Sequence, residues 1–216
     1  AEVSLIVIAK APLPGKAKTR LIPDLGEGGA AAVAVACLED TLSAVAEAPA
    51  ARRVLVLDGN PGAWLPEAGF EILPQRAGGL SARLAGAFED SAAAPAVLVG
   101  MDTPQITAGL LEAAVEALCA EDIDAVLGPA SDGGYWTIGL REASPDVFSG
   151  VPMSASETGE RQRERLAQLG LRWSELEQLR DIDTIDDARA VAAAAPWTRC
   201  AAALRLLERE AAGARQ

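Results

Sequence analysis

Short, fully apolar segments alternate with helical patterns along almost the whole chain, and this alternation restricts the fold more than any other feature. Strand-like runs are expected at residues 3–9, 53–57, 70–73, 96–100, 124–128, 135–140 and 171–176. Strands without a polar face belong in a mostly parallel sheet that helices cover on both faces. We therefore expect one α/β domain over residues 1–216, with residues 135–140 antiparallel because so little chain precedes them.

Helical spacing of apolar residues fills the intervals between these runs. Helices are expected at residues 25–48, 80–91, 107–119, 154–169, 184–195 and 197–211. Thr107 is a candidate N-cap, and Thr184 with Asp187 forms a capping-box-like start. The two last helices, within 184–211, should pack on the domain, and homodimer contact is the alternative for the final one. Its apolar stripe comprises Trp197, Cys200, Ala201, Leu204 and Leu207.

The charge and the missing histidine narrow the function. The chain has 216 residues, a formal net charge of −12 and no histidine. An acidic surface does not suit nucleic acid, and the usual general base and commonest transition-metal ligand are absent. The apolar runs are strand-length and interrupted, so we expect no membrane span or signal peptide and a cytoplasmic protein. Three distant cysteines, Cys37, Cys119 and Cys200, are expected to be reduced core residues.

A glycine- and proline-containing basic loop follows the first strand and contains every lysine of the chain, namely Lys10, Lys16 and Lys18. Arg20 adds a planar cation, and such groups suit phosphate oxygens. The alternative is a solvated basic loop. The loop matches neither a P-loop nor a dinucleotide fingerprint. The residues expected to bind nucleotide here are Ala9, Lys10, Pro12, Gly15, Lys16, Lys18, Thr19 and Arg20.

Asp102 follows the apolar strand that ends near Gly100. In parallel sheets, ligands bind beyond the carboxyl ends of the strands. A carboxylate there is well placed to hold Mg²⁺, which prefers oxygen ligands and bridges to substrate phosphates. The alternative is an aspartate that shapes the turn before Pro104.

Residues 128–136 combine Asp132 with two adjacent glycines and Tyr135-Trp136. Gly133 and Gly134 permit positive φ and a close approach of the backbone to a ligand, and one of the two rings could face that ligand. Asp-Gly is also a strong hairpin-turn signal, and both interpretations can hold together.

A Gly-Gly turn opens the helix expected at residues 80–91, and helix N-termini bind anions. This segment could hold a base or ribose, and Arg83 could reach a phosphate or lie in solvent. The candidate nucleotide contacts are Gln75, Gly78, Gly79, Leu80 and Arg83.

The segment 181–187 is rich in aspartate. Its acidic residues suit the start of the following helix. The functional alternative makes Asp183, or less favourably Asp181, a second metal ligand. The segment is not an EF-hand, because its sixth loop position is not glycine.

Taken together, these motifs resemble the nucleotide-diphospho-sugar transferase superfamily. The matching segments are Lys-x-Pro-x-x-Gly-x-x-Lys-Thr-Arg-Leu, Gly-x-Asp-x-Pro, Gly-Pro-Ala-x-Asp-Gly-Gly-Tyr and Asp-x-Asp-Thr, between residues 5 and about 187. Within it, the chain is similar to a bacterial family often labelled glycosyltransferase, sometimes linked to arsenosugar biosynthesis, and to guanylyltransferases of deazaflavin and molybdenum cofactors. The resemblance implies a Rossmann-like domain of GT-A fold.

The resemblance also implies roles for single residues. Lys10, Lys18 and Arg20 would contact nucleotide phosphates, and Asp102 with Asp183 would hold Mg²⁺ or Mn²⁺. Asp132 would be catalytic, as would Lys18, Arg20 and Asp102. Gly133, Gly134 and Tyr135 would bind the acceptor.

The chain departs from the family at Gly79, at Met153-Ser154 and at Ile185. The first two concern recognition of the base or acceptor, and the third looks structural.

Two reactions fit this pattern. The favoured one is Mg²⁺-dependent nucleotidyl transfer from a nucleoside triphosphate to a small phosphorylated acceptor, with release of pyrophosphate. Such transfer needs positioning and charge neutralisation more than a strong base, which fits a chain without histidine. The alternative is glycosyl transfer from a nucleotide sugar, with Asp132 as base. A third possibility is a nucleotide-binding protein of this fold without catalysis. No nucleic acid or membrane partner is expected.

Overall fold

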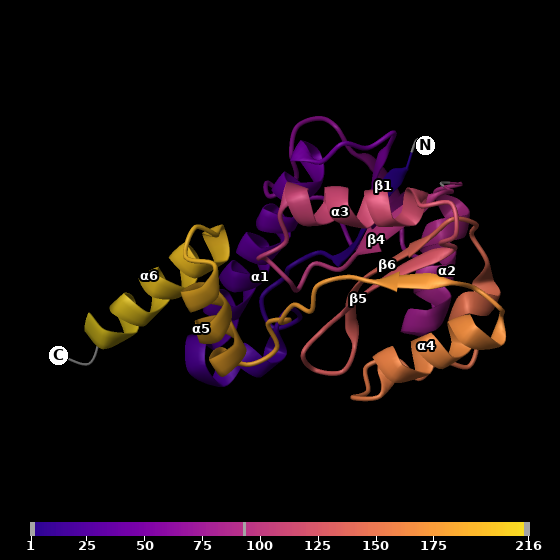
Figure 1. The fold of residues 1–216 in the computed structure, drawn as a ribbon. Coiled ribbons are helices and arrows are strands. Elements are labelled where there is room, and N and C mark those ends of the chain that lie inside the picture. The colour runs from indigo at the N-terminus through magenta and orange to yellow at the C-terminus, as the bar shows by residue number, and fades with distance from the viewer. Residues whose placement is uncertain (1–2, 93, 214–216) are drawn as a thin grey trace.

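The computed structural model of the protein describes residues 3–92 and 94–213. Its centre is a seven-stranded sheet in the order β3-β2-β1-β4-β6-β5-β7 (Figure 1). The strands are β1 Ser4–Lys10, β2 Arg53–Asp58, β3 Glu71–Pro74, β4 Ala96–Val99, β5 Ala125–Pro129, β6 Tyr135–Leu140 and β7 Trp173–Glu175. The pairs β1–β2, β1–β4, β2–β3 and β5–β7 are parallel. The predicted mostly parallel sheet is confirmed.

The predicted reversal of β6 is also confirmed, because β6 is antiparallel to both β4 and β5. Only five residues separate β5 from β6, too few for the crossover that a parallel pair would need. The hairpin inserts β6 between β4 and β5 and brings the 130–134 turn to the carboxyl end of β4.

Six α-helices accompany the sheet among the described residues. They are α1 Ile22–Glu47, α2 Leu80–Asp90, α3 Ala108–Cys119, α4 Thr158–Gln168, α5 Ile185–Ala194 and α6 Arg199–Gly213, with 3₁₀ turns at Thr19–Leu21 and Pro145–Phe148. Thr107 caps α3 by accepting a hydrogen bond from the Leu110 amide, and Thr184 and Asp187 form the predicted capping box of α5.

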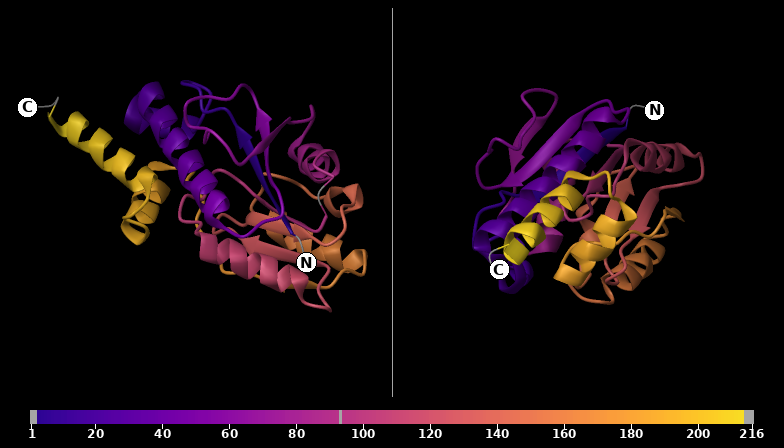
Figure 2. Two further views of the ribbon diagram at one scale, coloured as in Figure 1. Left: turned by 90° about the horizontal axis from the view of Figure 1, so that it is seen from above. Right: turned by 90° about the vertical axis from the view of Figure 1, so that its left-hand side faces the viewer.

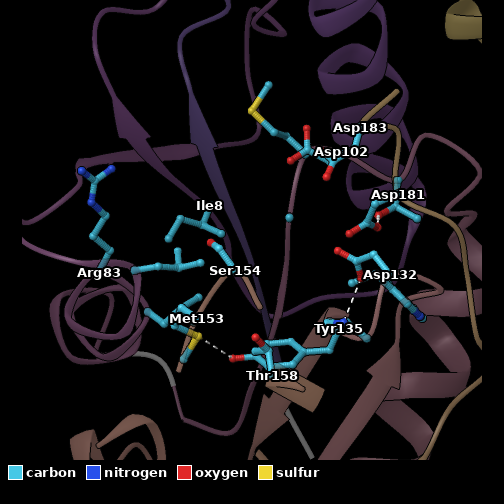
Figure 3. A pocket seen from close by; sticks show the side chains of 18 of the residues that line it. Ile8, Arg83, Asp102, Asp132, Tyr135, Met153, Ser154, Thr158, Asp181 and Asp183 are labelled. Atoms are coloured by element: carbon cyan, nitrogen blue, oxygen red, sulfur yellow. Dashed lines mark hydrogen bonds between the residues drawn. The ribbon is translucent and has the colours of Figure 1, made fainter. Parts of the chain in front are cut away.

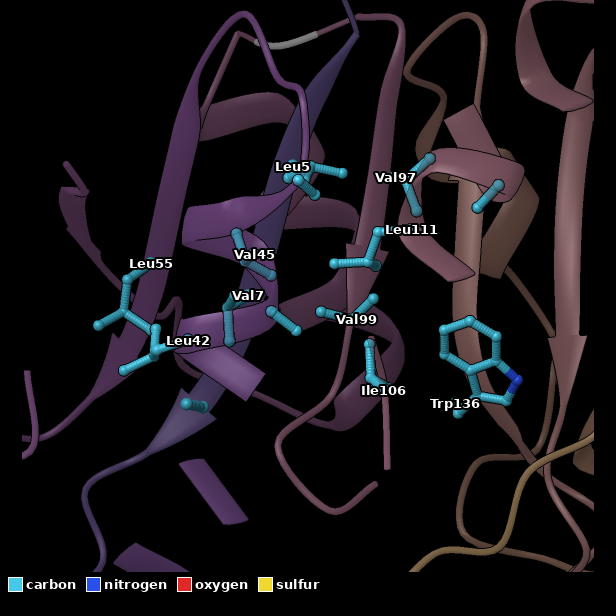
Figure 4. Close-up of a cluster of buried hydrophobic side chains, with 14 of the residues drawn as sticks. Leu5, Val7, Leu42, Val45, Leu55, Val97, Val99, Ile106, Leu111 and Trp136 are labelled. Carbon is cyan, nitrogen blue, oxygen red and sulfur yellow. The ribbon is translucent and has the colours of Figure 1, made fainter. Parts of the chain in front are cut away.

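Alternate residues of each strand face opposite helical layers (Figure 4). Leu5 and Val7 of β1 belong to a cluster with Leu42 of α1 and Leu111 of α3. Ile6 faces the other side, in a cluster that includes Leu84 and Phe88 of α2, Phe148 of the second 3₁₀ turn and Leu166 of α4. Burial on both faces explains why these strands have no polar side.

A third cluster joins α5 and α6 to α1. Figure 2 shows α6 beside α1, with its C-terminal end extending away from the sheet. Asp40 of α1 accepts hydrogen bonds from the Arg199 and Cys200 amides, each at 3.0 Å, and so satisfies donors at the start of α6.

Several sequence expectations need correction. Trp197 is 69% exposed, because it precedes α6 and does not share its periodicity, whereas Cys200 and Leu204 are buried as predicted. Cys119 is exposed, whereas Cys37 and Cys200 are buried. Homodimer contact through α6 stays a prediction.

The expectation that no run could cross a membrane also needs correction. The helical stretch Thr19–Glu47 is long and apolar enough by length and composition, but 72% of its apolar window is buried inside the protein. That is the burial of a core helix.

Candidate functional site

A cavity of about 670 Å³ lies where β1 and β4 end and β6 begins (Figure 3). It is bounded by the end of β1, the start of α2, residues 100–103 after β4, the 132–137 turn and strand, the 153–158 segment and residues 181–183. A smaller cavity of about 210 Å³ shares Arg20, Asp102 and Asp183 with it. The location is the one that the topology of an open α/β sheet favours for ligands.

Most of the predicted site residues meet here. The large cavity is lined by Ala9, Lys10, Arg20, Gln75, Leu80, Arg83, Asp102, Asp132, Gly134, Tyr135 and Asp183. Lys18 and Thr19 line the smaller cavity. Pro12, Gly15, Lys16, Gly78, Gly79 and Gly133 line neither cavity.

Four aspartates form one wall of the large cavity (Figure 3). They are Asp102 after β4, Asp132 in the β5–β6 turn, and Asp181 and Asp183 before α5. The segment before α5 is held in place because the Ile182 amide donates to the Asp102 carbonyl at 2.9 Å. Residues more than 160 positions apart in the chain, such as Lys18 and Asp183, are thereby brought together.

Lys18 does not extend into solvent. Its side chain is 6% exposed, its ammonium lies 2.5 Å from Asp102 Oδ1, and it donates to the Ile182 carbonyl. Its backbone is left-handed, at φ 48° and ψ 45°. Burial alone lowers the pKa of Lys18, but the charge of Asp102 outweighs this effect together with smaller contributions, so the pKa is raised above its ordinary value. Lys18 is therefore a cation at neutral pH, fixed behind Asp102.

Arg20 makes the second ion pair of the site, with Nη1 3.1 Å from Asp183 Oδ2. This pair is open, because the side chains of Arg20 and Asp183 are 71% and 46% exposed. Exposed ion pairs contribute little stability. Arg20 can therefore leave Asp183 for a ligand at small cost.

Asp181 is the most perturbed carboxyl group of the wall. Its pKa is raised to about 6, mainly by burial and also by the charges of Asp102 and Asp132, while a hydrogen bond from Thr103 at 2.6 Å acts against them. Repulsion from Asp102 and Asp132 shows that these carboxylates sense one another. A cation placed among them would relieve that repulsion.

The 132–134 turn is tied to the segment before α4. Asp132 accepts a hydrogen bond from the Gly134 amide at 2.8 Å, as in an Asx-type turn. Gly133 has φ +93°, and a Cβ there would collide with the Ser156 carbonyl. Its carbonyl also accepts from the Gly159 amide at 2.8 Å. Packing against the protein therefore explains the need for glycine at 133.

The opposite wall carries one cation, Arg83 (Figure 3). Its guanidinium is held by the Gly78 carbonyl at 2.9 Å, by Asp58 at 3.3 Å and by Gln75 at 3.4 Å. Gln75 in turn donates to the Ala9 and Val56 carbonyls. Both side chains are thus already oriented at the cavity edge.

Tyr135 and Trp136 divide the two tasks considered for them. Tyr135 lies at the floor of the cavity and donates to Gln162 at 3.3 Å (Figure 3). Burial raises the pKa of Tyr135, so the hydroxyl stays neutral. Trp136 is buried in the core, with its indole N–H 2.9 Å from the Glu177 carbonyl.

Part of the site was missed by sequence reasoning. Thr103 and the stretch Met153, Ser154, Ala155, Ser156 and Thr158 also line the cavity. This stretch was expected to begin a helix, but α4 starts at Thr158, whose hydroxyl bonds to the Pro152 and Ala155 carbonyls. Ser154, at φ 58°, is a further irregularity. Hydroxyl-bearing residues at 154–158 were the available signal.

Asp102 and Asp183 supply carboxylate oxygens of the kind that Mg²⁺ prefers. Among residues 3–92 and 94–213, however, no three acidic, histidine or cysteine side chains converge closely enough to enclose a metal ion. Two carboxylates beside an open cavity fit a metal that takes its other ligands from substrate phosphates and water. The residues present therefore fit a nucleotide-bound divalent cation.

Comparisons with solved structures agree with this fold. A structure from Desulfovibrio desulfuricans G20, named a "putative nucleotide-diphospho-sugar transferase", is 28% identical over 97% of this chain and 98% of that one, with a TM-score of 0.84. A CMP-2-keto-3-deoxy-manno-octonic acid synthetase complexed with CTP shares 12% identity over 91% and 99%, at 0.60. The 2-C-methyl-D-erythritol 4-phosphate cytidylyltransferase of Thermus thermophilus shares 20% over 96% and 100%, at 0.50.

These likenesses confirm the GT-A-like fold and the resemblance to nucleotide-diphospho-sugar transferases. No curated protein matches the sequence. One family does match, over residues 41–155, which is more than half of the chain. The chain belongs to the bacterial family described as "Uncharacterized protein conserved in bacteria (DUF2064)".

Proposed function

We propose that the protein is a cytoplasmic, Mg²⁺- or Mn²⁺-dependent nucleotidyltransferase that acts on a nucleoside triphosphate and a small phosphorylated acceptor. The observation that carries the proposal is the pairing of cations with carboxylates at one mouth of the cavity, Lys18 with Asp102 and Arg20 with Asp183. Phosphate transfer needs both kinds of group, cations for the phosphates and carboxylates for a metal.

In this reaction an acceptor phosphate oxygen attacks the α-phosphorus in line. A new P–O bond forms, the bond between the α-phosphorus and the bridging oxygen breaks, and pyrophosphate leaves with the electron pair. Lys10 and Arg20 line the cavity where they can neutralise phosphate charge. Asp102 and Asp183 would hold the metal, which when bound supplies positive charge to the α-phosphate and the leaving group.

The acceptor would occupy the part of the cavity between Tyr135, Ser154 and Thr158. Neutral hydroxyl groups there can donate hydrogen bonds to a phosphorylated compound, and Arg83 faces them from the opposite wall (Figure 3). No strong base is needed, because a phosphate acceptor is already ionised at neutral pH.

Glycosyl transfer from a nucleotide sugar is the second candidate. It is favoured by the name of the Desulfovibrio structure, the most similar of the three described. In this reaction the same cations and metal would stabilise a departing nucleoside diphosphate. Asp132 would accept the proton of an acceptor hydroxyl, and its position on the cavity wall permits this.

Two assays on one purified sample separate the candidates. The first follows pyrophosphate release from each of the four nucleoside triphosphates with a panel of phosphorylated acceptors, and the second follows nucleoside diphosphate release from common nucleotide sugars. We expect acceptor-dependent pyrophosphate release. Asp102→Asn should lower it by about a hundredfold or more, because electrostatic stabilisation of the transition state is lost.

The matched control is Asp122→Asn, because the Asp122 side chain is 86% exposed and lies in a surface ion pair with Arg172. It should keep the wild-type rate within about twofold, as exposed ion pairs contribute little. Nucleoside diphosphate release from a nucleotide sugar would establish glycosyl transfer instead. Nucleotide binding with no turnover in either assay, unaffected by Asp102→Asn, would support the binding protein without catalysis.

A further inference from the structure

The two cation–carboxylate pairs at the mouth of the cavity differ in one respect. Lys18 is almost completely buried behind Asp102, whereas Arg20 is largely exposed beside Asp183. One pair is therefore built into the protein, and the other can open. This difference bears on how a divalent cation can reach the two carboxylates.

The Lys18 ammonium is fixed by several contacts. It contacts Asp102 Oδ1 and the Ile182 carbonyl, and the Ile182 amide in turn donates to the Asp102 carbonyl. Its left-handed backbone is unfavourable for a residue with a side chain. Such strain is retained where surrounding contacts determine the conformation. Lys18 is thus held against Asp102 and not free to move to a distant phosphate.

A fixed ammonium cancels the charge of Asp102. Once Arg20 turns away, the pair of carboxylates presents a net charge of only −1 to a divalent cation, and Lys18 repels that cation at short range. The half-exposed Asp102 side chain still faces the cavity. The missing negative charge can come from nucleotide phosphates, which Mg²⁺ usually bridges.

We infer that Lys18 is a resident counter-ion that makes the metal site incomplete without nucleotide, so that the protein takes its divalent cation as a complex with the nucleotide. The inference rests on the proposed function and refines it. Arg20, displaced from Asp183 by the metal, becomes available to the phosphates. Lys18 is accordingly a positioning and charge-setting residue, and its counterpart Lys16 has no such role.

The test measures binding of Mn²⁺ by the loss of its free-ion electron paramagnetic resonance signal, without turnover. Mn²⁺ is titrated alone and then with CTP or GTP into wild type, Lys18→Met and Lys16→Met. Lys16 is the matched control, because it lies in the same loop, is exposed and lines neither cavity. Lys18→Met should bind Mn²⁺ alone at least about tenfold more tightly than wild type, because a nearby positive charge is gone. Lys16→Met should match wild type.

Wild type should bind Mn²⁺ at least about tenfold more tightly with nucleotide than without, and Lys18→Met should lose most of that difference. Equal Mn²⁺ affinity of Lys18→Met and Lys16→Met in the absence of nucleotide would overturn the inference. If Lys18→Met does not fold, equal affinity of wild type for Mn²⁺ with and without bound nucleotide would overturn it instead. Failure of the proposed function looks different: neither nucleotide would bind, while Lys18→Met would still bind Mn²⁺ alone more tightly.

Discussion

The ionisation of Asp181 costs the folded protein stability. Its pKa is raised to about 6 from an ordinary value of 3.8, mainly by burial. The folded state therefore binds a proton more tightly than the unfolded state does. Stability from this proton is fully present below about pH 3.8 and is lost as the pH rises through about 6. At pH 7 the cost is at most about 3 kcal/mol, at about 1.4 kcal/mol for each pKa unit.

Asp181→Asn should remove this cost. Asparagine keeps an oxygen for the hydrogen bond from Thr103 and carries no charge at any pH. We expect the free energy of unfolding to rise at pH 7 by up to about 3 kcal/mol relative to wild type, and to change little at about pH 4. Urea unfolding curves across this pH range would measure the difference, with Asp122→Asn as a surface control. An equal gain at both ends of the range would contradict the assigned pKa.

Single residues also mark the limit of prediction from sequence. The carboxylates Asp102, Asp132 and Asp183 were placed correctly at the cavity, because the ends of the apolar strands meet there. The burial of Lys18 could not be predicted. It depends on the contact of its loop with residues 102 and 182, which are remote in sequence. A basic loop and a buried ion pair have the same local pattern.

Among the elements, those with strong local signals were predicted best. The strands follow continuous apolar runs, and α3 and α5 start at the threonines that cap them. The start of α4 was placed four residues too early. The segment before it makes its hydrogen bonds with the 132–134 turn and within itself, and these tertiary contacts override helical propensity.

The contact between this segment and the β5–β6 turn gives a prediction at Gly133. Gly133→Ala would place a Cβ against the Ser156 carbonyl at a positive φ. We expect a loss of about 3 kcal/mol in the free energy of unfolding, because backbone strain and a steric clash act together. The 153–158 side of the cavity should shift as well. Chemical denaturation and the affinity for the acceptor would measure the two effects.

Gly150→Ala separates strain from collision. Gly150 has a similar positive φ, of +76°, but a Cβ there would meet no atom within 4 Å. It should cost only about 1 kcal/mol, the backbone contribution alone, and leave acceptor affinity unchanged. If both variants lost the same stability, the packing of Gly133 on Ser156 would not be the reason for its glycine.

At the scale of the whole molecule, the site joins parts of the chain that only folding brings together. Its charged groups come from the loop after β1, the end of β4, the β5–β6 turn and the segment before α5. These segments span residues 10 to 183, and the last of them leads into the helices that pack on α1. An unfolded chain cannot present these groups together, so a ligand of the site binds the folded state alone.

Nucleotide should therefore stabilise the protein globally. At a concentration about one hundred times its dissociation constant, in the presence of Mg²⁺, it should add about 2.7 kcal/mol to the free energy of unfolding. For a chain of this length the melting temperature should rise by about 5–10 °C. Differential scanning calorimetry with each nucleoside triphosphate, against sodium sulfate at equal ionic strength, would separate specific binding from a general salt effect. Lys10→Met should reduce the rise at fixed nucleotide concentration, because Lys10 lines the cavity, whereas Lys16→Met should leave it unchanged. An equal rise in both variants would show that the nucleotide does not bind along this face of the cavity.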